Sequence, residues 1–411
     1  MTDQRARGRT TLLAPLVLLA GLLAPQVAVA PASAAAPDDT VLEAALQADV
    51  EAYLADRGTA EHVSAAGLSV SLADRDDSID VSAGTTSMGG SEPVRPDSVW
   101  QIGSHTKAFT SVLLLQYEAE GRLSIDDPLG EWLPQYPQWA DVPIRRLLDM
   151  TSGIADYDSQ PAFLDTYIAD PQTHFSAEQL IGYAEGAPGT TGWSYSNTNY
   201  VLAELVVEEV TGNSYREELE ERLLEPLDLD DTFYREHLYP SAVTDREPAG
   251  YFANDQVPDP YTGFVGTDTS RDTLSWARGA GGIIGTTGDL TRWTRALYSG
   301  ELLPAEQQAE LTSLVSTTTG LPIGQTSPED PSGFGLGVAQ VTAEPLGTFW
   351  FYEGGTLGFR TLHVYLPESG VVMAMGLNSV TAEDQIIALA VAVHETLVAQ
   401  GAVPAPVAAA A

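Results

Sequence analysis

The segment Gln101–Phe109 contains a serine and a lysine whose spacing suits nucleophilic chemistry. Lys107 is the only lysine of the chain, against eighteen arginines, and it follows Ser104 by three residues. An apolar run continues to Glu120-Gly121, which predicts a helix, and residues three apart share a helix face. Because a desolvated lysine can lose its proton and an arginine cannot, the lone lysine indicates a titratable amine beside the hydroxyl. The alternative is a capping serine followed by a surface lysine.

A second polar stretch, residues 193–200, precedes another apolar run that predicts a helix. Tyr195 could present a phenol and Asn197 an amide to a cleft. A tyrosine near a lysine ammonium has its phenolate stabilised, which is what a proton shuttle needs. The alternative is that Ser196 or Asn197 is only a helix cap.

A third stretch, residues 350–360, carries glycines inside a segment that otherwise resembles a strand. Glycine in a strand marks a bulge or the close approach of another backbone or a ligand. Gly354 and Gly355 are therefore candidates for a binding edge beside Tyr352. Taken alone, the stretch is better explained as a hairpin turn.

The three stretches occur in a recognisable order: Ser104-His105-Thr106-Lys107, then Tyr195-Ser196-Asn197, then Tyr352-Glu353-Gly354. In this order the chain resembles the serine β-lactamase and penicillin-binding-protein-like hydrolases. The resemblance is to the branch with class C β-lactamases, D-alanyl-D-alanine carboxypeptidases, D-stereospecific peptidases and related esterases. It extends from about Val41 to about Val398.

The resemblance implies a mechanism through an acyl-enzyme, with Ser104 as nucleophile and Lys107 as its general base. Tyr195 would relay a proton to the leaving group and later activate the deacylating water. Asn197 would hold the amide on the acyl side of the substrate. The backbone N–H groups of Ser104 and Gly355 would form the oxyanion hole. No metal or organic cofactor is expected.

The third motif departs from the family pattern, because carboxypeptidases and lactamases of the family usually have Lys or His where Tyr352 stands. A neutral tyrosine followed by Glu353 is a poor anchor for a substrate carboxylate. Arg360 and Arg278 are the candidates for a replacement. If neither serves, neutral or cationic substrates are favoured, such as amides, esters and peptides with a blocked or basic C-terminal part.

These features predict a serine hydrolase of the D-alanyl-D-alanine carboxypeptidase or D-stereospecific peptidase type. Its expected substrates are peptides or small esters, including peptidoglycan stem peptides or β-lactams. Carboxylesterase and class C β-lactamase are alternatives on the same fold. A non-catalytic cell-envelope binding protein is the alternative from another class, although a pure binder has no need for the serine–lysine pair.

Other catalytic arrangements are less well supported by the sequence. It contains no Gly-x-Ser-x-Gly elbow and no His-Glu-x-x-His motif. The histidines are scattered without ligand spacing, and we interpret each as structural. They are His62, His105, His174, His237, His363 and His394.

Composition gives the expected location and excludes some partners. Residues 1–34 combine three arginines, an apolar run and the small residues Ala32-Ser33-Ala34, which predicts a secretory signal peptide and an exported protein. Its removal changes the formal net charge from −38 to −40, because three arginines and Asp3 are lost. Such an acidic chain would repel nucleic acid and anionic lipid. No membrane-spanning segment is expected, and without cysteine there is no disulfide.

The hydrophobic pattern predicts an α/β (α+β) fold with strands near both chain ends and helices between them. An antiparallel sheet flanked by helices would form an α/β lobe from about 38–103 and 275–400. A mainly helical lobe, about 104–274, would be inserted into this single catalytic domain of residues 38–400, with 239–271 as a surface excursion. Residues 401–411 are expected to be a disordered tail. The expected strands are 67–73, 79–83, 334–341, 347–352, 360–366 and 371–377; the expected helices include 38–56, 177–184, 200–210, 215–224, 287–298, 305–314 and 382–399.

Overall fold

The computed structural model describes residues 39–75, 77–257, 261–382 and 384–403. The predicted signal peptide, residues 1–34, lies outside these ranges, and so do residues 404–411 of the expected tail. Residues 401–403 were expected to be disordered but are placed: the Ala402 N–H donates to the Leu397 carbonyl, and Val403 is buried. Within the described ranges, no helix has the length and apolar character needed to cross a membrane.

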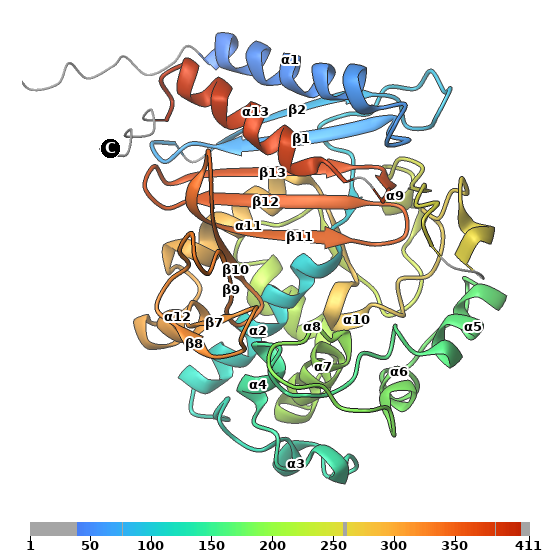
Figure 1. Ribbon diagram of the computed structural model, residues 1–411, viewed down its shortest axis with the longest axis vertical. Helices are drawn as coiled ribbons and strands as arrows, with labels where there is room; N and C mark the ends of the chain where they lie inside the picture. Colours follow the sequence, from blue (N-terminus) through green and yellow to red (C-terminus); the bar gives the residue numbers. More distant parts are fainter. Residues whose placement is uncertain (1–38, 76, 258–260, 383, 404–411) are drawn as a thin grey trace, which may run out of the picture. The chain divides into compact units, whose positions relative to one another are not determined.

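The main sheet has nine strands, and both ends of the described chain contribute to it (Figure 1). Its order is β2-β1-β13-β12-β11-β10-β9-β7-β8, and every neighbouring pair is antiparallel. The predicted fold class is therefore confirmed. The strands are β1 Ala65–Ser71, β2 Ser78–Gly84, β7 Leu314–Ser316, β8 Pro322–Ile323, β9 Ser332–Phe334, β10 Ala339–Ala343, β11 Gly347–Gly355, β12 Arg360–Leu366 and β13 Val371–Leu377.

Both faces of the central strands are covered, which is why β1 and β13 are buried along their whole length. Successive side chains of a strand point to opposite faces. Met373 and Met375 of β13 join the apolar cluster of the terminal helices α1 (Asp39–Arg57) and α13 (Ile386–Ala399). Ala374, between them, joins the other large cluster, together with Trp293 of α11 (Thr287–Ser299). Figure 1 shows α1 and α13 on one side of the sheet and α11 on the other.

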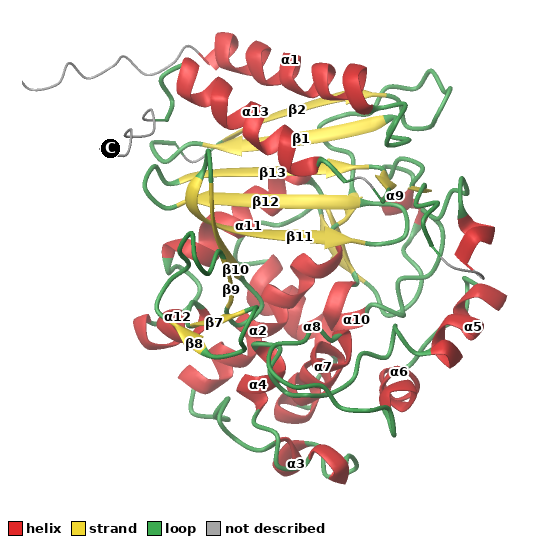
Figure 2. Cartoon of the chain, in the orientation of Figure 1, coloured by secondary structure: helices red, strands yellow, loops and turns green. Residues whose placement is uncertain are grey.

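Helix α2, Thr106–Ala119, runs through the helical part and is buried over eleven of its positions. It packs against α7, α10 and α12, and Figure 2 shows how helices dominate this region. The other helices are α3 Leu129–Trp132, α4 Ile144–Leu148, α5 Pro161–Ala169, α6 Ala177–Ala184, α7 Asn197–Thr211, α8 Tyr215–Leu219, α9 Ser241–Thr244, α10 Arg278–Gly281 and α12 Ala305–Leu311. A π-helical turn, Glu220–Leu224, continues α8.

Two small sheets join the helical part to the main sheet. Strand β6 (Ile283–Gly285) pairs with β3 (Trp100–Gln101) and with β4 (Thr232–Tyr234). Strand β14 (Ser379–Val380) pairs in parallel with β5 (Tyr251–Phe252). The first of these sheets places β3 directly before the serine segment.

Most predicted elements occur in the structure, and the differences have local causes. The single strand expected over 334–341 is two strands, β9 and β10. Gly337 adopts a φ of +77°, and the Gly335 N–H donates to the Val338 carbonyl, so the chain turns back between them. The segment 239–271 is more than a surface excursion, because it contains α9 and β5 and buries Val243 and Phe252.

Arg360 of β12 anchors a buried charge network between the two ends of the described chain. Its guanidinium donates to Glu61 at 2.8 Å and also to Asp384. We expect Arg360→Ala to lower the free energy of unfolding by about 3–5 kcal/mol, because Glu61 would remain buried without its partner. Urea denaturation measures this, with the exposed Arg95→Ala as control, for which a loss under about 0.5 kcal/mol is expected. Equal losses in the two variants would contradict the structural role of Arg360.

Candidate active site

Ser104 lies in a tight 3-10 turn, Gly103–His105, that leads directly into α2. The helix that was expected to begin at Ser104 therefore begins at Thr106, two residues later. Gly103 has a φ of +52°, and a Cβ atom there would lie 2.7 Å from the Gly355 nitrogen. A Cβ atom on Gly354 would lie 1.9 Å from the Ile102 carbonyl oxygen. Glycine at these positions lets the end of β11 approach the serine turn at backbone distance.

Lys107 is fully buried, and its amine contacts three acceptors. The Nζ atom lies 3.0 Å from Ser104 Oγ, 2.7 Å from Asn197 Oδ1 and 2.7 Å from the Ala280 carbonyl oxygen. Neither of the last two oxygens can donate a proton, so each takes one N–H of the amine. The Ser104 hydroxyl can both donate and accept, so among these three contacts it is the one through which a proton can pass between the amine and another group. Among the described residues, Lys107 has no ion-pair partner.

Tyr195 completes the contacts of the serine. Its hydroxyl lies 2.6 Å from Ser104 Oγ, and Lys107 Nζ lies 4.7 Å from the centre of its ring. Tyr195 stands just before α7, whose first residue is Asn197. Thus the structure brings Ser104, Lys107, Tyr195 and Asn197, which sequence predicted, into one hydrogen-bonded cluster.

The N–H of Gly355 faces the serine turn, as its position in the ladder shows. In an antiparallel pair, hydrogen-bonded and non-bonded residue pairs alternate. The Thr356 N–H donates to the Phe359 carbonyl, so the next pair, Gly355 with Arg360, is a non-bonded one. The Gly355 N–H therefore points away from β12, and β10 on the other side pairs only as far as Phe351. The Gly355 N–H and the N–H of Ser104, which lies in the 3-10 turn before α2, can therefore both face a developing oxyanion.

Tyr352 lies in the site as a neutral phenol. It is 5% exposed, and its hydroxyl has no hydrogen-bond partner among the described residues. Burial, together with the neighbouring Tyr195 and Tyr200, raises the pKa of Tyr352 well above its usual value.

Arg278 and Arg360, the two candidates for binding a substrate carboxylate, form ion pairs with other side chains of the protein. Arg278 pairs with Glu204 at 2.5 Å, and Arg360 pairs with Glu61 and Asp384. Glu204 also accepts the Gly279 N–H at 2.7 Å and so fixes the turn that carries the Ala280 carbonyl. Neither arginine is therefore free to bind a substrate carboxylate in the candidate site.

Two carboxylates that the sequence analysis missed hold Asn197 in place. The Asn197 side-chain amide donates to Asp158 at 2.8 Å, and its backbone N–H donates to Asp156 at 3.0 Å. Burial, followed by the negative charge of Asp158, raises the pKa of Asp156; burial also raises the pKa of Asp158. The only sequence signal was an Asp-x-Asp pair after the turn at Gly153.

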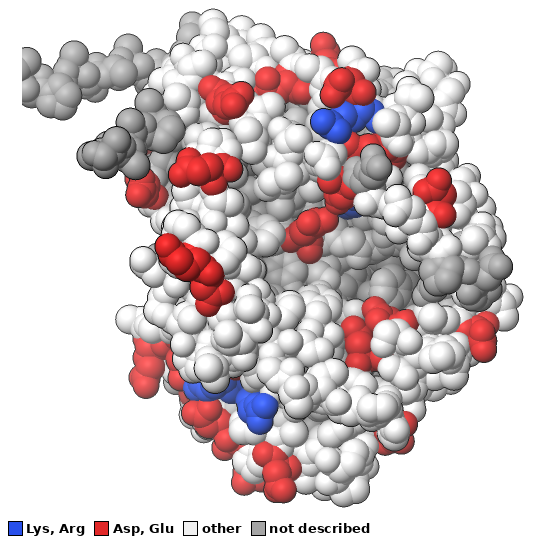
Figure 3. Space-filling model, in the orientation of Figure 1, with Lys and Arg blue, Asp and Glu red and all other residues white. Residues whose placement is uncertain are grey.

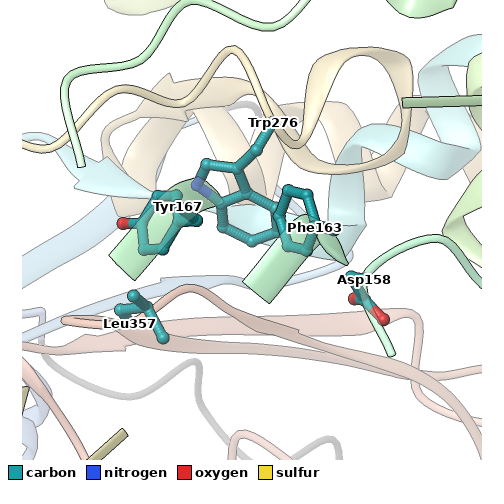
Figure 4. Close-up of a pocket in the computed structure, with 5 residues that line it drawn as sticks. All are labelled: Asp158, Phe163, Tyr167, Trp276 and Leu357. Atoms are coloured by element: carbon teal, nitrogen blue, oxygen red, sulfur yellow. The ribbon is translucent and has the colours of Figure 1, made fainter. Parts of the chain in front are cut away.

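A cavity of about 210 Å³ opens beside Asp158. Figure 4 shows Phe163, Tyr167 and Trp276 grouped together, with Asp158 at one end and Leu357 beneath. Leu357 follows Gly355 by two residues, so the cavity adjoins the site on the Asn197 side. Aromatic faces with a carboxylate suit an apolar group that carries an ammonium.

A second cavity, of about 300 Å³, lies on the Tyr195 side of the site. Its lining is Trp193, Tyr195, Thr317, Ser332, Phe334, Ala339, Phe351, Tyr352 and Glu353. Figure 3 shows a hollow in this face of the molecule, below β11, with acidic side chains on both sides of it.

His105 and His363 form a buried pair beneath the serine turn. Their Nδ1 atoms lie 3.0 Å apart, and burial lowers the pKa of His105 to about 3 and that of His363 well below its usual value. Both rings are thus kept neutral, as expected of structural histidines. The described residues contain no group of three or more His, Cys, Asp or Glu side chains arranged to hold a metal ion.

The fold and this serine–lysine–tyrosine cluster point to the class of serine hydrolases. The sequence profile of the family described as Beta-lactamase matches residues 42–396. The chain therefore belongs to the β-lactamase family, and the resemblance stated from its motifs is confirmed.

Individual relatives agree with this assignment. The chain is 27% identical to penicillin-binding protein 4* of Bacillus subtilis, over 69% of its own length and 61% of that protein. It is 26% identical to the D-alanyl-D-alanine-carboxypeptidase/endopeptidase AmpH of Escherichia coli, over 75% and 78% of the two chains. A solved D-stereospecific amidohydrolase from Streptomyces is 30% identical, with a TM-score of 0.70, over 87% of this chain and 98% of that one. D-amino acid amidase from Ochrobactrum anthropi, 22% identical with a TM-score of 0.72 over 87% and 98%, shares the fold.

Lys107→Arg tests whether a titratable amine is needed at this position. We expect kcat/KM to fall about 100- to 10,000-fold, although the charge is kept, because arginine cannot accept the serine proton. The assay is hydrolysis of a nitrophenyl ester, with circular dichroism to verify folding. Arg122→Lys, a matched exchange at a partly exposed position, should leave the rate unchanged. Full activity in Lys107→Arg would exclude the amine as the base.

Proposed function

We propose that this protein is an exported serine hydrolase that forms an acyl-enzyme on amides and peptides of D-amino acids. The observation that carries the proposal is the position of Ser104 Oγ, within hydrogen-bond distance of both Lys107 Nζ and Tyr195 OH. Lysine and tyrosine on one hydroxyl supply the two proton transfers that acyl transfer needs. Export is proposed from the signal-peptide pattern of residues 1–34.

In acylation, Ser104 Oγ attacks the substrate carbonyl and Lys107 accepts the serine proton. The tetrahedral oxyanion accepts hydrogen bonds from the backbone N–H groups of Ser104 and Gly355. Tyr195 donates its proton to the leaving nitrogen, the C–N bond breaks, and Lys107 restores the proton to the phenolate. In deacylation, Tyr195 and Lys107 take a proton from water as it attacks the ester carbonyl; the Oγ–C bond breaks, and the same groups return the proton to Ser104 Oγ.

The acyl part of the substrate is proposed to lie in the cavity beside Asp158. Its free amino group would meet Asp158, and its apolar side chain would meet Phe163, Tyr167 and Trp276. The Asn197 amide, already oriented by Asp158 and Lys107, would face the acyl-side amide of the substrate. The D configuration is supported by the similarity to the Streptomyces D-stereospecific amidohydrolase.

A carboxypeptidase acting on a free C-terminal D-alanine is the second candidate, supported by the similarity to AmpH. The amidase is favoured over the carboxypeptidase, because a terminal carboxylate would find no cation in the site. Tyr352 is uncharged, and Arg278 and Arg360 are paired with Glu204 and Glu61. Carboxylesterase and class C β-lactamase remain alternatives within the same chemistry, and a non-catalytic binding protein remains outside it.

A labelling experiment and a substrate panel separate these functions. A fluorescent penicillin should label the wild type covalently and leave Ser104→Ala unlabelled. D-phenylalanine amide should be hydrolysed faster than its L enantiomer, a D-Ala-D-Ala peptide, a chromogenic cephalosporin and a nitrophenyl ester. Absence of both labelling and turnover would favour the binding protein. Faster turnover of the D-Ala-D-Ala peptide would assign a carboxypeptidase instead.

Asp158→Asn tests the proposed contact with the substrate amino group. We expect KM for D-phenylalanine amide to rise about tenfold with a smaller change in kcat, because a hydrogen bond between charged groups is lost. N-acetyl-D-phenylalanine amide lacks the ammonium and should show no such rise. The exposed Asp141→Asn is the matched control. An equal effect on both amides would mean that Asp158 acts only through Asn197.

A further inference from the structure

The cavity lined by Trp193 and Tyr352 has a chemical character that the proposed function leaves unused. It holds about 300 Å³ and is separate from the aromatic cavity beside Asp158, with which it shares no lining residue. The inference drawn from it rests on the acyl-enzyme chemistry proposed above.

The cavity lies on the side from which the leaving group departs. Tyr195 lines it, and Tyr195 is the group that hands a proton to the leaving nitrogen. Asp158 lines the other cavity and accepts a hydrogen bond from Asn197, and both are proposed to address the acyl part. A substrate bound across Ser104 therefore directs its leaving amine toward Trp193 and Tyr352.

Most of the lining is apolar. The rings of Trp193, Phe334 and Phe351 provide large apolar surfaces. The polar atoms Trp193 Nε1 and Tyr352 Oη are buried, so these two residues also present their rings to the cavity. Burial of an apolar side chain against such rings is favourable. The cavity thus suits an apolar group.

Charge decides what this apolar group can carry. Glu353 lines the cavity, and burial, followed by the neighbouring Asp384, raises its pKa to about 7. A substrate carboxylate would have to be desolvated beside this acidic group with no cation in the lining, whereas a carboxamide or peptide carbonyl carries no such cost. Arg278 and Arg360 cannot turn toward it without leaving Glu204 and Glu61 buried and unpaired.

We propose that this cavity is a leaving-group subsite for an apolar residue whose C-terminal side is an amide or a continuing peptide bond. The enzyme would then cleave inside blocked or longer peptides and discriminate against a free C-terminal acid. In the step itself, the Ser104 Oγ–C bond forms, the C–N bond breaks, and the serine proton leaves with the amine by way of Lys107 and Tyr195. The departing product is a neutral or cationic amino-acid amide or peptide.

The test holds the acyl part constant as D-phenylalanyl and varies the leaving amine among ammonia, glycinamide, leucinamide and leucine, each leucine compound in both enantiomers. We expect kcat/KM for the preferred leucinamide to exceed that for glycinamide by about tenfold or more, because the isobutyl group is buried. It should exceed that for free leucine by about tenfold or more, because the carboxylate finds no cation.

Two variants change these ratios in known directions. Tyr352→Lys supplies a cation and should raise the leucine-to-leucinamide ratio about tenfold or more. Trp193→Ala removes a large apolar surface from the lining, so the leucinamide advantage over ammonia as leaving group should shrink. Tyr365→Phe, a matched exchange on β12 away from the cavity lining, should leave every ratio as in the wild type.

The outcomes separate the subsite from the chemistry. Turnover of D-phenylalanine amide with equal rates for all leaving groups, or a preference for free leucine, would overturn the subsite and leave the proposed function intact. No turnover of any member, with no covalent label on Ser104, would overturn both. Unchanged ratios in Tyr352→Lys would show that the leaving group does not reach this cavity.

Discussion

Lys107 is fully buried, and no carboxylate among the described residues pairs with its amine; this is the constraint on which the site depends. A buried amine must find hydrogen-bond acceptors, because a polar group taken out of water without a partner costs free energy. Lys107 finds these acceptors in the Asn197 side chain and the Ala280 carbonyl. The third contact of the amine is with Ser104 Oγ. The burial of Lys107 is thus linked to the chemistry proposed for Ser104.

Each of the two acceptors is fixed by a carboxylate one step further out. Asp158 holds the Asn197 amide, and Glu204 holds the turn that presents Ala280. The acidic groups thus orient the acceptors of Lys107 without contacting its amine themselves.

The same charges give the cleft its expected preference among substrates. Asp158 lines one cavity and Glu353 the other, while Arg278 and Arg360 form ion pairs with buried glutamates. The proposed preference for neutral and cationic substrates thus depends on a few side chains, set around a backbone in which Gly103 lies against Gly355.

The sequence by itself predicted that Ser104 and Lys107 lie together, because a helical turn brings side chains three residues apart onto one face, and the 3-10 turn that leads into α2 does the same. It also determined strands such as 360–366 and 371–377, where the hydrophobic pattern left no competing structure. Only the tertiary structure decided which groups surround that pair. The Ala280 carbonyl lies 173 residues from Lys107 in the chain, and a backbone oxygen leaves no mark in a sequence. The partners of Arg278 and Arg360 and the two cavities likewise depend on how distant segments pack, and local patterns do not encode that packing.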